Sequence, residues 1–188
     1  MRLLIATTGA SGAIYTQWLL DNLDACKHEI HLITTLHARE VAQLELPKGE
    51  LVANTRVKWY DENGSMSVPF VSGSVKFDAM VIIPASMGTI GRIANGVSDT
   101  TIARAADVFL KERRKLILVP RESPYNLIHL RNMATLTEAG AIIIPASPSF
   151  YSKPKTVSDL VDTIIARVLD HLGIEHKLVK RWQSTDRP

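Results

Sequence analysis

The sequence has 188 residues, of which 46% are hydrophobic and 22% charged, and its formal net charge is +3. This balance fits one soluble domain over residues 1–188, and a mild charge without a basic stripe argues against nucleic-acid binding. The single cysteine, Cys26, excludes a disulfide within the chain, and no apolar run approaches the roughly 18 residues of a membrane span. The first predicted strand begins too close to Met1 to leave room for a signal peptide, so we expect a cytoplasmic protein with no membrane partner.

Five short apolar runs rich in β-branched residues predict strands, at 3–7, 30–34, 80–84, 116–120 and 141–145. Because they do not alternate with polar residues, both faces of the sheet should be covered. Helical patterns lie between them: around 14–23, from about 38 to 45, from a cap at Asp99 to about 113, and from Thr156 or Ser158 to Leu172, with Gly173 as the stop. Strand and helix in alternation predict the α/β class with a parallel sheet flanked by helices.

Two segments fit this alternation less well. Residues 46–78 show weak periodicity, and a structureless loop of that length is uncommon, so we expect an inserted hairpin or a functional loop. The tail from about 174 to 188 is basic and contains Trp182.

A glycine-containing turn at residues 8–13 (TGASGA) follows the first strand and opens the first helix. Glycines allow a ligand to approach the backbone, and the free N–H groups of a helix start favour a phosphate. The alternative is a structural turn with Ser11 as a helix cap. A dinucleotide-binding enzyme would need different glycine spacing and an acidic residue after the second strand, where Thr34 and Thr35 stand, so a mononucleotide such as FMN fits better.

A second candidate phosphate site follows the third predicted strand, at residues 84–89 (PASMGT). Ser86 and Thr89 would lie at the carboxyl end of the strand, where open α/β sheets bind ligands. Simple helix capping explains the same residues equally well.

Charged residues later in the chain are candidates for anion binding and proton transfer. Arg104 and Lys111 lie seven residues apart and therefore share a helix face, although a solvated face is the alternative. Arg121 and Glu122 follow a strand, where Arg121 could grip a phosphate and Glu122 could move a proton. The remaining candidates, Glu45, Tyr151 and Arg167, individually look like surface or core residues. The six histidines show no metal-ligand spacing, so we predict no metal.

Together these segments resemble the UbiX-like flavin prenyltransferases. The resemblance covers nearly the whole chain and is carried by residues 8–13, 72–74, 84–89, 104–107, 110–113, 120–124, 150–151 and 181–182. It implies a flavodoxin-like Rossmann fold and a homo-oligomer, usually a dodecamer, whose active sites are shared between subunits. It also implies that reduced FMN and dimethylallyl monophosphate are the substrates, that bonds form at flavin N5 and C6, and that the prenylated FMN serves a UbiD-like decarboxylase, with no metal required.

The resemblance assigns roles to individual positions. Contacts with FMN fall to Gly9, Ala10, Ser11, Thr35, Ser86, Met87, Gly88, Thr89 and Arg121. Contacts with the allyl phosphate fall to Lys111, Arg121, Tyr151 and Arg167, and proton transfer to Ser11, Glu45 and Glu122. Lys111 is counted as catalytic because a cation stabilises the leaving phosphate. The sequence departs from many relatives at Ala85 and at residues 35–36, and residues 46–71 match poorly.

Two other functions are compatible with parts of the pattern. A decarboxylase of the phosphopantothenoylcysteine type has a motif like residues 84–89, but with an Asn where Gly88 stands, and it needs a catalytic histidine. A flavin-binding carrier that catalyses no reaction would not need the residues assigned to the allyl phosphate. We also expect oligomerisation from Trp18, which lies on a helix that already has an apolar face.

Overall fold

The computed structural model describes residues 1–179, so Arg181 and Trp182 lie outside the described part of the chain. Its centre is a six-stranded parallel sheet in the order β3-β2-β1-β4-β5-β6. The strands are β1 (Arg2–Thr7), β2 (Glu29–Thr34), β3 (Lys58–Asp61), β4 (Ala79–Ala85), β5 (Lys115–Pro120) and β6 (Ile142–Ile143). Without the edge strand β3, the other five follow the order of flavodoxin-like folds.

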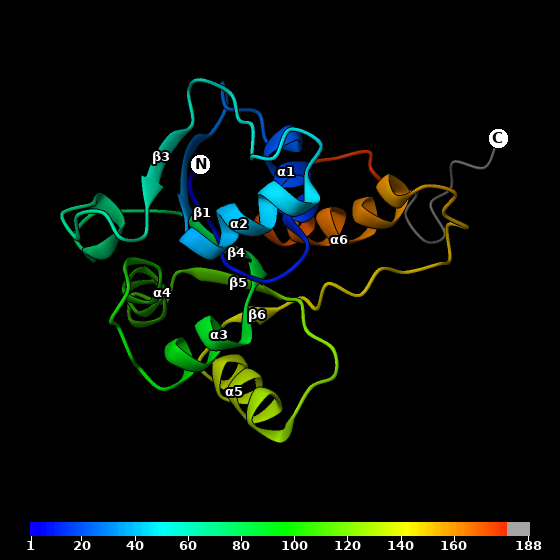
Figure 1. Cartoon of the computed structure of the whole chain (residues 1–188). Coiled ribbons are helices and arrows are strands. Elements are labelled where there is room, and N and C mark those ends of the chain that lie inside the picture. Colours follow the sequence, from blue (N-terminus) through cyan, green and yellow to red (C-terminus); the bar gives the residue numbers. More distant parts are fainter. Residues whose placement is uncertain (180–188) are drawn as a thin grey trace.

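Helices cover both faces of the sheet, which explains why the strands read as continuous apolar runs. The helices are α1 (Ala13–Asn22), α2 (Leu36–Glu45), α3 (Met87–Ala94), α4 (Thr101–Lys111), α5 (Leu127–Glu138) and α6 (Val157–Leu172), with a 3₁₀ turn, η1 (Pro69–Val71). Helices α1, α2 and α6 lie on one face, and α3, α4 and α5 on the other (Figure 1). Every residue of β4 is buried between the two layers.

Most of the predicted elements are confirmed, with differences at their ends. The fifth predicted strand is reduced to Ile142–Ile143. Helix α6 is capped by Thr156, whose side chain accepts a hydrogen bond from the backbone of Asp159, and it ends at Gly173 with φ 75°. The cap of α4 is Thr100 rather than Asp99, because the Thr100 hydroxyl accepts from the backbone N–H of Ala103.

The segment 46–78 contains a strand rather than the expected hairpin. Strand β3 extends the sheet in parallel beside β2, and its first two residues are exposed. The sequence pattern did not reveal this strand, because an edge strand with exposed positions lacks the continuous apolar run of a central strand. Helix α5 was missed for a related reason, since Leu136 is its one buried residue.

Trp18 does not serve the role that the sequence suggested. Its indole Nε1 donates to Asp162 Oδ1 at 2.8 Å, and its ring packs against the core between α1 and α6. It therefore joins two helices of the same chain and is not an argument for oligomerisation.

The loops after β1 and β4 begin at the point where the strand order changes direction, since β1 lies between β2 and β4. In open α/β sheets this position forms a crevice at the carboxyl ends of the strands. The two predicted phosphate-binding segments, 8–13 and 84–89, both lie there.

Candidate functional site

The turn after β1 is held rigidly against β4 and α2. The Thr8 hydroxyl donates to the Pro84 carbonyl at 2.8 Å and accepts from the Ser86 N–H at 2.8 Å. A Cβ added to Gly9 would lie 2.5 Å from His37 Cβ, so this position requires glycine. Gly12 has φ 113°, a left-handed conformation that side chains disfavour. The two glycines therefore permit a close approach of backbone segments at the end of β1.

Three helices begin around one cavity of about 400 Å³ beside this turn. Their first turns are capped by the hydroxyl groups of Thr35, Ser86 and Thr100, each of which accepts from a backbone N–H of its own helix. The cavity is lined by Thr8, Gly9, Thr35, Leu36, His37, Glu62, Asn63, Ser86, Thr89, Arg92 and Thr100. The positive ends of three helix dipoles and several hydroxyl groups suit a phosphate group.

The second predicted phosphate site caps α3 and also contributes to the lining of this cavity. The Ser86 hydroxyl accepts from the Thr89 N–H at 3.4 Å and lies 3.0 Å from the Thr89 hydroxyl. Both residues also line the cavity. Met87 is buried, whereas a Cβ added to Gly88 would meet only the end of the Arg92 side chain, 3.5 Å away.

Two residues of this cavity, Glu62 and Arg92, were not predicted from the sequence. Burial raises the pKa of the Glu62 carboxyl, although a hydrogen bond from Thr100 and the charge of Arg92 oppose the rise. Arg92 lies three residues after Thr89 on α3, a spacing that could have placed it on the same helix face. Glu62 follows the edge strand β3 and had no comparable signal.

Glu45 lies at the glycine turn, although its sequence pattern alone indicated a surface position. Its Oε2 accepts hydrogen bonds from the backbone N–H groups of Gly12 and Ala13, both at 2.8 Å. The carboxylate thus stands at the positive end of α1. Arg121 lies beside the same turn, since its Nε donates to the Ser11 carbonyl at 3.0 Å. The structure therefore brings Ser11, Glu45 and Arg121 together.

Tyr15 and Glu122 border this group. Burial raises the pKa of the Tyr15 phenol, and the positive charge of Arg121 opposes that rise. Glu122 Oε1 accepts from the backbone N–H of Ser123 at 3.1 Å. Ala10, also predicted, is buried within the turn, and its N–H donates to the Thr8 carbonyl at 2.8 Å.

Tyr151 and Arg167 line a second cavity, of about 320 Å³, together with Ser147, Ser149 and Thr163. Arg167 Nη1 is 3.1 Å from Asp170 Oδ2. None of the glycine-turn residues lines this cavity.

Lys111 lies far from the glycine turn of its own chain. Helix α4 begins at the first cavity and ends at Lys111, which pairs with Glu112 at 2.8 Å. A helix of 11 residues is about 16 Å long, which places Lys111 near the amino ends of the strands. Arg104 shares the helix and pairs with Asp107 at 3.1 Å. The backbone of Gly73 packs against Lys111 and Glu112, so the motif at 72–74 joins Lys111 and not the glycine turn.

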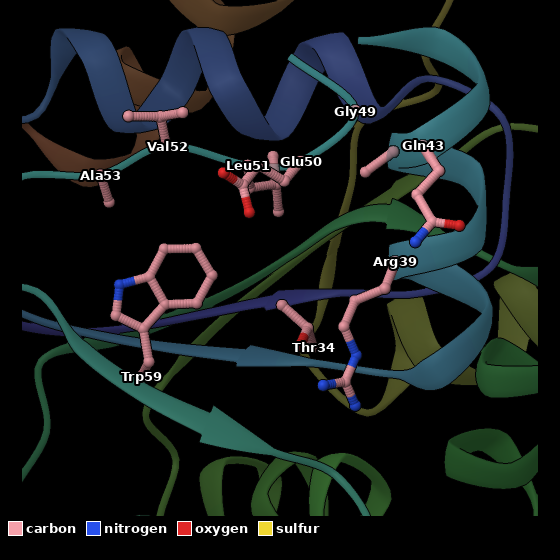
Figure 2. Close-up of a pocket in the computed structure, with 10 residues that line it drawn as sticks. Thr34, Arg39, Gln43, Gly49, Glu50, Leu51, Val52, Ala53 and Trp59 are labelled. Carbon is pink, nitrogen blue, oxygen red and sulfur yellow. The ribbon is translucent and has the colours of Figure 1, made fainter.

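A further cavity, of about 530 Å³, lies between α2, β3 and residues 49–53, and none of the predicted site residues lines it. Figure 2 shows Arg39 and Gln43 on one side of it and Trp59 on another. Arg39 forms an ion pair with Asp61.

Within residues 1–179, no group of three or more His, Cys, Asp or Glu side chains is arranged to hold a metal ion. The helices in that part of the chain are too short or too polar to cross a membrane.

Known proteins match this chain over nearly its whole length. Residues 1–169 match the flavoprotein family. The chain is 46% identical to the flavin prenyltransferase UbiX of Methanocaldococcus jannaschii, over 97% of this chain and 98% of that protein. It is 43% identical to the flavin prenyltransferase UbiX of Pseudomonas aeruginosa, over 96% of this chain and 93% of that protein.

Solved structures extend the comparison. A dodecameric FMN-dependent UbiX-like decarboxylase from Escherichia coli O157:H7 matches with a TM-score of 0.88 and 38% identity, over 98% of this chain and 100% of that one. AnUbiX (PadA1), solved with FMN and dimethylallyl pyrophosphate, matches with a TM-score of 0.89 and 37% identity, over 98% of both chains. A PPC decarboxylase, with a TM-score of 0.61 and 22% identity over 79% of this chain and 82% of that one, shares the fold alone.

Proposed function

The chain belongs to the UbiX-like flavin prenyltransferases of the flavoprotein family, and from this we propose that it joins the dimethylallyl group of dimethylallyl monophosphate to N5 and C6 of reduced FMN. It is a prenyltransferase that uses FMN. The observation that carries the proposal is the meeting of three capped helix starts at a glycine turn, with Glu45 and Arg121 on the other side of that turn.

Two bonds form in the proposed reaction, and neither requires an oxidant. The first joins N5 to the allyl carbon while the carbon–oxygen bond breaks, so that phosphate leaves with the bonding electrons and N5 loses a proton. The second joins C6 to the allyl group after a proton is added to the allyl double bond, and the proton on C6 then leaves. Cations near the leaving phosphate favour the first step, and a base favours the second.

Each group of residues has a role in this proposal. The cavity with Thr35, Ser86 and Thr89 holds the phosphate of FMN, and Gly9 lines the same cavity. The contacts of Ala10, Ser11, Met87 and Gly88 with FMN remain predictions from the family motif.

Proton transfer falls to Ser11, Glu45 and Glu122. The Glu45 carboxylate is bound to the two N–H groups that begin α1, directly after Ser11. This position fits a base that takes a proton from the flavin ring once the first bond has formed.

The allyl phosphate would be bound by Lys111, Arg121, Tyr151 and Arg167, residues that one chain does not bring together. Lys111 is at the far end of α4 from the first cavity, and Tyr151 and Arg167 line a separate cavity. We propose that neighbouring subunits complete each site, in an oligomer that is a dodecamer like the Escherichia coli relative.

The surface of α5 supports self-association better than Trp18 does. Leu127, Ile128 and Leu130 are 59%, 66% and 49% exposed and lie within one turn of each other. An apolar patch of this kind on a soluble protein commonly marks an interface.

The product would serve a UbiD-like decarboxylase, in a cytoplasmic location; both stay predictions. The decarboxylase alternative is disfavoured by Gly88, which stands where that class has an Asn. A flavin carrier is disfavoured because it would have no use for the cavity that contains Tyr151 and Arg167.

Nuclear magnetic resonance of the isolated flavin product tests the two-bond proposal. Reduced FMN is incubated anaerobically with dimethylallyl monophosphate, and in parallel with the diphosphate. We expect the aromatic proton of C6 to disappear, and the monophosphate to be the better donor. A product that keeps the C6 proton would refute the second bond, and equal use of both donors would refute the choice of donor.

A further inference from the structure

The first cavity contains one opposed pair of charged side chains, Arg92 and Glu62, among hydroxyl, amide and imidazole groups. Among its lining residues, Arg92 carries the only permanent positive charge and Glu62 is the only carboxylic acid. Neither residue was part of the family motifs identified in the sequence. Because three helix starts already make the cavity favourable to an anion, the arginine adds to this preference and the carboxylate opposes it.

Arg92 is directed toward the start of its helix. It lies one turn beyond Thr89 on α3, and its Nη1 would be only 3.5 Å from a Cβ on Gly88. Its Nε is 3.4 Å from Asp99 Oδ1, a long and half-exposed ion pair. Within residues 1–179, the two terminal guanidinium nitrogens of Arg92 form no hydrogen bond. The guanidinium thus lies next to the Ser86–Thr89 turn with its terminal donors available to a ligand.

Glu62 brings a negative charge to the same cavity when its carboxyl group is ionised. Thr100 and the charge of Arg92 both act to lower the pKa of its half-buried carboxyl. Burial is the largest cause of the raised pKa of this group, as expected for a carboxyl that is partly removed from water. Arg92 pairs with Asp99, whereas Glu62 and Arg92 influence each other electrostatically from within the cavity lining.

We propose that Arg92 is a specificity residue that recognises the 5′-phosphate of FMN, and that Glu62, as the one carboxylic acid among the lining residues, opposes phosphate binding. This proposal rests on the proposed function, because it requires the flavin phosphate to bind in the first cavity. A guanidinium binds phosphate through charge-assisted hydrogen bonds. Riboflavin lacks the phosphate, so both residues should affect FMN and not riboflavin.

Fluorescence quenching of FMN and of riboflavin on the purified full chain measures the two affinities separately. Arg92→Gln should raise the Kd of FMN by about tenfold or more, which corresponds to one charged hydrogen bond, and should change the Kd of riboflavin less than about twofold. Arg92→Lys should lie between the wild type and Arg92→Gln. Glu62→Gln should lower the Kd of FMN several-fold and leave riboflavin unchanged.

Arg39→Gln is the matched control. The side chains of Arg39 and Arg92 are both 48% exposed and each pairs with one aspartate, but Arg39 lines the cavity of Figure 2. This variant should change neither Kd.

The outcomes separate this proposal from the proposed function. If Arg92→Gln leaves the Kd of FMN unchanged, or weakens FMN and riboflavin equally, Arg92 does not recognise the phosphate. If Arg92→Gln does not fold, Glu62→Gln decides, and a Kd of FMN that fails to fall overturns the proposal. A wild-type protein that binds neither flavin would instead contradict the proposed function itself.

Discussion

At the scale of single residues, Gly9 shows most directly how the sequence builds the site. Its backbone packs against His37 at the start of α2, where a side chain has no room. Gly88, by contrast, faces only the flexible end of Arg92. Gly9 and Gly88 belong to similar motifs, but a side chain would be excluded by a neighbouring residue only at Gly9.

Gly9→Ala should therefore lower the free energy of unfolding by about 1–3 kcal/mol, the usual cost of overpacking, and should weaken FMN binding. Urea denaturation followed by circular dichroism gives the stability. Gly88→Ala is the control and should change stability little. Equal stability losses in both variants would show that the contact with His37 is not the cause.

Glu45 is the residue whose role depends most on its surroundings. Glu45→Gln should bind FMN normally and accumulate a flavin alkylated at N5 but not cyclised, because an amide of nearly the same shape cannot accept the proton from C6. The absorption spectrum of the trapped species, or a crystal structure, distinguishes it from the closed ring. Formation of the cyclised product at the wild-type rate would move the role of base to Glu122.

At the scale of secondary structure elements, β3 is attached to the sheet through a buried imidazole. His31 lies 3.0 Å from both the Tyr60 hydroxyl and Glu29 Oε1, and its ring stacks on Tyr60. Burial lowers the pKa of His31. Hydrogen bonds from Lys58 and His31 lower the pKa of Glu29 to about 2.

These pKa shifts predict that the free energy of unfolding decreases as the pH is lowered. A histidine whose folded pKa is below its unfolded value of about 6.5 contributes fully above that pH and loses its contribution as the pH falls below it. The Glu29 contribution is lost between the unfolded pKa of 4.5 and about 2. The urea concentration at the unfolding midpoint should therefore decrease as the pH is lowered from 7.5 to 5.5, and His31→Phe should make this decrease smaller. His28, whose pKa is also lowered by burial, contributes a decline of the same sign. An unchanged slope in His31→Phe would contradict the prediction.

The elements also show what the sequence could and could not predict. Strands β1, β2, β4 and β5 were predicted because burial on both faces gives them continuous apolar runs. Helix α5 and strand β3 were not, because exposed positions on both weaken the periodicity. The glycine turn and the Ser86 cap were predicted because the ends of parallel strands meet at one edge. Arg92 was not predicted, although its helical spacing from Thr89 could have indicated it, and Glu62 was not, because tertiary packing alone places it in the cavity.

At the scale of the whole molecule, the distance of Lys111 from its own glycine turn requires a second copy if Lys111 serves catalysis. Lys111→Ala and Glu45→Gln should each be inactive in prenylated FMN formation alone. Coexpressed in one oligomer, they should recover up to about a quarter of the wild-type activity, because some sites then receive an intact Glu45 from one chain and an intact Lys111 from another. Purified mixtures of separately assembled oligomers are the control and should stay inactive. No recovery in coexpressed oligomers would place both residues in the site of one chain.

Mass spectrometry of the flavin shows whether this chain attaches a dimethylallyl group to FMN. Reduced FMN, dimethylallyl monophosphate and the purified protein are incubated without oxygen. The flavin is then released and its mass is measured. We expect the mass of reduced FMN plus one dimethylallyl group less one hydrogen, and we expect this species to be absent when the protein or the allyl donor is omitted. Recovery of unmodified FMN alone, from a protein that binds FMN and is folded, would contradict it.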